Sequence, residues 1–173
     1  MRLPHLFFLV GLLIGFSSCI PTKSSTGAPV IIQLSALEDF TPMEKPDYVP
    51  AYQHEAKQAL AVNAGKYKDK YAIAETVFAG PAGTYTLELT SLQETDGEST
   101  YVFYRDDKRI AAATNDPTTV DYQPQIHKLG KVKLKPGQRL AIAFNSHSNG
   151  KIPEGDAFAF SRGRWTGIKL TRE

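Results

Sequence analysis

The chain has 173 residues, of which 42% are hydrophobic, and it carries 20 basic against 18 acidic side chains. This near balance lacks the basic excess that binding to phosphate backbones requires, so no nucleic acid partner is expected. Cys19 is the only cysteine, which excludes an internal disulfide and leaves a hydrophobic core as the source of stability.

The N-terminus has the order of a secretory signal. Arg2 precedes an apolar run over residues 6–16, and Ser17 and Ser18 stand directly before Cys19. The run is shorter than the roughly 20 apolar residues that span a bilayer. The cysteine resembles that of a bacterial lipobox, although Phe16 replaces the more usual leucine. This resemblance implies cleavage after residue 18, lipid on Cys19 and a lipid-anchored place in the bacterial cell envelope.

The alternative is an ordinary secreted protein with a leftover thiol, which an oxidising compartment disfavours. Residues 20–29 are small, polar and flanked by proline, a composition typical of a flexible tether. The predicted organisation is therefore a signal peptide over residues 1–18, a tether over 19–29 and one domain over 30–173.

The domain is predicted to be all-β. Short alternating or β-branched runs are separated by turns rich in Gly, Pro and Asp, as in an antiparallel β-sandwich. Residues 51–62 also fit one amphipathic helix; a strand is favoured for the second half and the first half stays open. In chain order, the runs that predict strands are 30–40, 58–62, 71–78, 84–92, 99–105, 109–114, 132–134, 140–144, 157–161 and 164–170.

The first unusual polar segment covers residues 93–99. A hairpin can turn on Asp96 and Gly97 alone, yet Glu94 and Glu98 flank them. Four interpretations stay open: a solvated acidic turn, a calcium-type cation site, acceptors for sugar hydroxyls, or partners for an internal arginine.

The second segment covers residues 145–165 and is expected to meet the first at one end of the sandwich. Arginine offers a planar fork of donors, and tryptophan offers a flat apolar face, which together suit a sugar ring. Alternatively, the arginines pair with Glu94, Asp96 or Asp156, and the tryptophan belongs to the core. The candidate ligand-binding residues of both segments are Glu94, Asp96, Glu98, Asn145, His147, Lys151, Arg162, Arg164 and Trp165.

Catalysis is poorly supported by the sequence. Ser146 and His147 are neighbours, and neighbours on an extended chain point to opposite sides. A glycosidase would require two facing carboxylates, for which Glu98 and Glu154 are the conceivable pair. Zinc is disfavoured because the histidines are far apart in sequence and lack a thiolate partner. No catalytic residue is predicted.

Two stretches carry a resemblance to a known class of domain. "FAGPAGTYTLELTSLQETDGESTYVFYRDDKRI" and "VKLKPGQRLAIAFNSHSNGKIPEGDAFAFSRGRW" resemble carbohydrate-binding-module-like β-sandwiches of the galactose-binding jelly-roll kind. The resemblance covers about residues 58–170. It implies a jelly roll that binds a carbohydrate polymer without catalysis, with glycan-degrading enzymes as partners. Such modules often begin with a Glu-Ala-Glu segment that binds structural calcium; Glu38 and Asp39 retain part of it, which leaves calcium open.

Two rival functions follow from the alternatives above. A structural or assembly lipoprotein would use the arginine and acidic motifs as an internal lock, and a glycan hydrolase is a third, less favoured option. An exposed Trp165 face beside free donors would support sugar binding. A covered Trp165 with saturated arginines would support the lock.

Overall fold

The computed structural model describes residues 28–173, so the predicted signal peptide, Cys19 and most of the predicted tether lie outside the described residues. Within the described part, no helix is long and apolar enough to cross a membrane. The elements are β1 (Ile31–Ser35), β2 (Thr41–Pro42), β3 (Ala51–His54), the 3-10 helix η1 (Glu55–Lys57), β4 (Ala59–Val62), β5 (Tyr71–Val77), β6 (Gly83–Leu92), β7 (Thr100–Arg105), β8 (Lys108–Thr114), β9 (Pro124–Leu134), β10 (Arg139–Asn145), β11 (Pro153–Glu154), β12 (Ala157–Phe158) and β13 (Trp165–Arg172).

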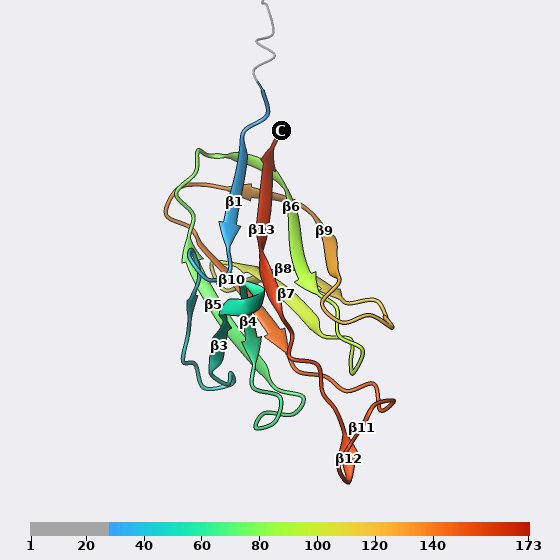
Figure 1. Cartoon of the computed structure of the whole chain (residues 1–173). Coiled ribbons are helices and arrows are strands. Elements are labelled where there is room, and N and C mark those ends of the chain that lie inside the picture. Colours follow the sequence, from blue (N-terminus) through green and yellow to red (C-terminus); the bar gives the residue numbers. More distant parts are fainter. Residues whose placement is uncertain (1–27) are drawn as a thin grey trace, which may run out of the picture.

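Two antiparallel sheets form the sandwich (Figure 1). One has the order β3-β4-β13-β6-β9, with β1 paired to β13 as a sixth strand, and the other has the order β2-β5-β10-β7-β8. The short hairpin β11–β12 projects from one end of the molecule. This architecture confirms the predicted all-β antiparallel sandwich.

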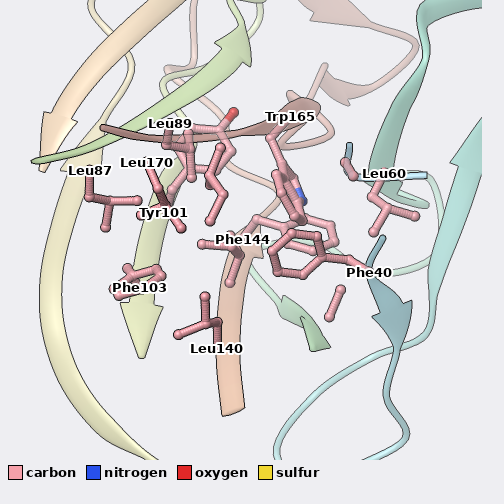
Figure 2. Packing of buried hydrophobic residues seen from close by; sticks show 14 of the residues in the cluster. Phe40, Leu60, Leu87, Leu89, Tyr101, Phe103, Leu140, Phe144, Trp165 and Leu170 are labelled. Carbon is pink, nitrogen blue, oxygen red and sulfur yellow. The ribbon is translucent and has the colours of Figure 1, made fainter. Parts of the chain in front are cut away.

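The core lies between the two sheets because alternate residues of their central strands point inward. In β10, Leu140 and Phe144 are fully buried in the main cluster, and β6 contributes Leu89 from the facing sheet. Trp165 packs edge-to-face on Phe40, with ring centroids 4.9 Å apart, and Figure 2 shows both rings inside this cluster. Burial of aromatic area at this point ties the start of β13 to the segment after β1.

The N-terminal half differs from the prediction in two places. The strand predicted over residues 30–40 ends at Ser35, because Asp39 accepts a hydrogen bond from the Ser35 backbone N–H at 2.7 Å and closes a turn. Residues 51–62 form a hairpin of two strands, with the 3-10 helix between them and Gln58 in the left-handed region. The strand favoured for the second half of this segment is confirmed, and the single helix is wrong.

The C-terminal half differs in two further places. The strand predicted over residues 132–134 begins at Pro124 and pairs with β6 along its whole length. A bulge at Gly130, whose φ is 91°, shifts the register and breaks the alternation that sequence patterns detect. The strand predicted over 157–161 is reduced to Ala157–Phe158 in an exposed hairpin.

Candidate functional site

The two predicted polar segments meet at one end of the sandwich, called the loop end below. The backbone N–H of Asn149 donates to Asp96 O at 3.1 Å, and the Asn149 side chain donates to Thr95 O at 3.0 Å. Gly97 allows this approach, because a Cβ there would lie 1.9 Å from His147 O. The expected meeting of these segments is confirmed.

A buried ion pair joins the segments. The Arg164 guanidinium binds Glu94 Oε2, while Glu94 Oε1 accepts the backbone N–H of Arg162 at 2.9 Å. Arg164 also donates from Nε to His54 Nδ1 at 2.9 Å, and only 1% of its surface is exposed. Both oxygens of Glu94 and two nitrogen atoms of Arg164, Nε and Nη1, are therefore engaged within the protein.

The ionisation of this cluster reflects its burial. Burial raises the pKa of Glu94, and the nearby charge of Arg164 acts in the opposite direction. Burial and then the positive charge of Arg164 lower the pKa of His54, which fits a neutral imidazole that accepts the Arg164 hydrogen bond. The cluster holds its shape best when His54 is neutral.

Tyr122 covers the ion pair from the outside. The Arg164 guanidinium carbon lies 5.0 Å from the centroid of its ring, and Lys57 Nζ lies 4.0 Å from the same centroid. Tyr122 has a φ of 64°, an uncommon value for an aromatic residue, and its N–H donates to Gln93 O at 2.7 Å. The aromatic cover thus contributes to keeping water from the pair.

Four of the predicted ligand-binding residues are buried, which corrects the expectation that they face a ligand. Trp165 is completely covered and packs on Phe40 and Phe144, so its ring offers no stacking face. Arg164 and Glu94 form the internal pair, and Asn145 accepts the Thr100 N–H at 2.6 Å. The physical reason is that β13 begins at Trp165 and directs this end of the loop between the sheets.

Two other predicted residues, Glu98 and Lys151, line an open groove of ≈ 670 Å³ at the loop end. Asn149 Nδ2 donates to Glu98 Oε1 at 3.3 Å, which orients the carboxylate. Ile152 adds an apolar wall and is 40% exposed. The remaining lining residues lie outside the predicted ligand-binding set and are Thr95, Pro117, Thr118, Thr119, Asn149 and Ile152.

The last three predicted residues lie elsewhere at the loop end. The exposed Arg162 lines a smaller hollow of ≈ 240 Å³ with Tyr52 and Asn63. Burial raises the pKa of Asp96, and its Oδ1 has no hydrogen-bond partner among the described residues. His147 Nδ1 lies 3.3 Å from Asp69 Oδ1 on the surface. The nine predicted residues therefore do not form one site.

The turn after β1 gives little support for calcium. In the described part of the chain, no group of three or more His, Cys, Asp or Glu residues could hold a metal ion. Glu38 and Asp39 are two carboxylates, and Asp39 already closes the turn at Ser35. Calcium takes six to eight oxygen ligands, so these residues alone do not fit it.

Comparisons with solved structures identify the fold. The CBM36-1 domain of a multidomain xylanase, from the hindgut metagenome of Trinervitermes trinervoides, superposes with a TM-score of 0.52 at 9% identity, over 82% of this chain and 96% of that domain. The fold is that of a carbohydrate-binding-module-like β-sandwich. The insecticidal crystal protein Cry2Aa also superposes, with a TM-score of 0.51 at 14% identity, over 82% of this chain and 21% of that protein.

The similarity is structural and does not extend to sequence. Protein-family models and curated proteins provide no match to this chain. One sandwich architecture thus occurs in a xylanase module and in an insecticidal protein. Because unrelated functions share a fold, the function has to be argued from the site.

Proposed function

We propose that the chain binds a carbohydrate polymer, without catalysis, in the groove beside Glu98 and Lys151. The observation that carries the proposal is the composition of this groove. It combines a carboxylate, an ammonium group and threonine hydroxyls with the apolar side chains of Ile152 and Pro117. A sugar presents hydroxyls on its rim and C–H groups on its faces, so it requires such a mixed surface.

The groove is held ready for a ligand. Asn149 donates to both Thr95 O and Glu98 Oε1, which leaves Glu98 Oε2 as an acceptor for a sugar hydroxyl. Lys151 is exposed, and its backbone N–H donates to Asn149 Oδ1 at 3.0 Å, so the ammonium supplies the complementary donor. Positioning before binding reduces the entropy cost of association.

The biological setting is part of the proposal. A signal peptide and a lipid on Cys19 would place the domain in the bacterial cell envelope, where a retained polysaccharide comes within reach of glycan-degrading enzymes. Support comes from the order of Arg2, the apolar run and Cys19 in the sequence. The shared fold with a module of a multidomain xylanase supports the glycan partner.

A structural or assembly role is the second candidate. The buried Glu94–Arg164 pair and the covered Trp165 favour it. The criterion for an internal lock is met only in part, because the exposed Arg162 makes no ion pair among residues 28–173. The lock and the groove use different residues, however, so both roles are compatible at the loop end. A serine nucleophile receives no support from Ser146, since Ser146 is fully buried and its hydroxyl donates to Tyr67 O.

The proposal is tested by affinity-gel electrophoresis and a glycan array with residues 28–173, with and without calcium. Lys151→Ala and Glu98→Gln should abolish retention on a polysaccharide that the unmodified domain binds. Lys66→Ala, which changes an exposed lysine outside the groove, is the matched control and should bind normally. Retention that survives both groove changes, or no retention on any glycan, would favour the structural role.

A further inference from the structure

Another hollow lies at the end of the sandwich opposite the loop end. The described chain enters at this end, and the C-terminus lies there (Figure 1). It has a volume of ≈ 450 Å³ and opens between the start of β6 and the end of β9. We propose that this hollow binds a phosphate-type anion, and that the anion is the headgroup of a membrane phospholipid. Its lining residues are Ala82, Gly83, Thr84, Arg105, Lys133, Leu134, Lys135 and Gln138.

Cations dominate the lining of this hollow. Arg105, Lys133 and Lys135 make no ion pair among residues 28–173, and no carboxylate lines the hollow. Arg172 adds a fourth positive charge, because its side chain crosses Gly83, where a Cβ would lie 2.6 Å from its Nε. An anion entering the hollow would therefore meet positive groups from several strands.

The guanidinium groups are already oriented. Arg105 Nη1 donates to Lys133 O at 2.8 Å, which joins the two sheets at this point and leaves its other N–H groups for a ligand. Arg172 Nη2 donates to Ala82 O at 2.8 Å in the same way. The planar fork of arginine matches phosphate oxygens in pairs, so fixed guanidinium groups favour phosphate over a monatomic anion.

The nearby carboxylates are occupied elsewhere. Asp106 accepts the Gln138 side-chain N–H at 2.7 Å and the Arg139 backbone N–H at 2.9 Å. Asp107 binds Arg139, and Glu173 lies 2.5 Å from Lys131. Asp107 and Glu173 are thus balanced by Arg139 and Lys131. Asp106 keeps its negative charge, so one carboxylate beside Gln138 stands against the four cations of the hollow.

The position of the hollow indicates a lipid as the source of the anion. The described chain enters at this end, and Val30 O accepts the Arg172 backbone N–H at 2.9 Å. Ile31 beside it is 53% exposed, an apolar contact suited to a membrane surface. A lipid on Cys19, a few residues before, would hold this end at the membrane. The assignment of the anion to a lipid rests on the proposed anchor. In this orientation the glycan groove would face away from the membrane.

The test uses residues 28–173, which contain the described hydrophobic cluster from Ala36 to Leu170. Sedimentation with vesicles of phosphatidylglycerol and phosphatidylcholine is compared with vesicles of phosphatidylcholine alone. A titration with inorganic phosphate, followed by the amide signals of Lys133 and Lys135 in NMR, separates a free anion from a lipid. Neither assay involves a glycan, so failure here is distinct from failure of carbohydrate binding.

The double change Lys133→Gln and Lys135→Gln should weaken binding to the anionic vesicles about 25-fold, since each surface cation contributes about 1 kcal/mol, or roughly fivefold. The matched control is Lys66→Gln with Lys68→Gln, which removes the same charge near the loop end and should bind normally. Equal losses in the two double variants, or binding of neither vesicles nor phosphate, would overturn the proposal. Phosphate binding without vesicle binding would overturn the lipid source and keep the anion site.

Discussion

Arg164 donates its Nε–H to Nδ1 of His54, so this ring nitrogen has to be unprotonated in the folded protein. The pKa of His54 is lowered by burial and by the charge of Arg164, in agreement with this geometry. Because the same arginine binds Glu94, the ionisation of His54 is linked to the contact between the two polar segments.

This relationship predicts a loss of stability in acid. A histidine with a folded pKa below its unfolded value of about 6.5 stabilises the fold fully above that value, and the contribution disappears as the pH falls through the folded pKa. The free energy of unfolding, measured with urea between neutral and mildly acidic pH, should fall less steeply for His54→Gln than for the unmodified chain. Parallel pH curves for the two proteins would contradict the link.

Removal of one partner of the buried pair should be strongly destabilising. Glu94→Gln leaves Arg164 as an unpaired buried charge, which costs about 3–5 kcal/mol in comparable cases. Glu98→Gln is the matched control, since this carboxylate lies at the open groove. Urea unfolding should show the loss only for Glu94→Gln. Similar stability of both variants would mean that the Glu94–Arg164 pair contributes little to the free energy of unfolding.

Substitution and fluorescence of Trp165 should show that this side chain belongs to the core and does not contact a sugar. Trp165→Ala is expected to cost about 3–5 kcal/mol, because a large buried ring leaves a cavity against Phe40 and Phe144. As Trp165 is the only tryptophan, its fluorescence should be shifted to the blue and poorly quenched by iodide. If iodide instead quenched the Trp165 fluorescence strongly, and a bound glycan prevented this quenching, Trp165 would stack on the sugar as first expected.

The backbone at Gly97 lies so close to His147 that a side chain at position 97 should not fit. Gly97→Ala places a Cβ 1.9 Å from His147 O, and the backbone shift that follows should cost about 1–3 kcal/mol. Gly65→Ala is the control, because its Cβ would meet only Asn63 Oδ1 at 3.5 Å. Thermal unfolding of the two variants measures the difference. A Gly97→Ala protein as stable as the control would show that the loops adjust without cost.

Much of the strand pattern could be predicted from local sequence. The strands over residues 71–78, 84–92, 99–105 and 140–144 agree with the structure to within about one residue, because alternation with a period of two is a property of neighbouring residues. The prediction failed where a non-local feature interrupts that period. The bulge at Gly130 is visible only in the pairing with β6, so most of β9 escaped detection.

Whether the polar segments and Trp165 face a ligand or are buried could not be predicted in the same way. Glu94, Arg164 and Trp165 have the chemistry of a sugar site and equally that of a buried lock, and residue type alone cannot separate the two. Tertiary structure decides, because β13 places Trp165 opposite Phe40 and brings Arg164 onto Glu94.

The groove depends on tertiary structure for a related reason. Its residues come from three loops, around Thr95, Pro117 and Lys151, whose proximity follows from the order of strands in the two sheets. The sequence by itself thus determined the fold class and the two polar segments, since both depend on local pattern. Which side chains face solvent was decided by packing between residues that lie far apart in the chain.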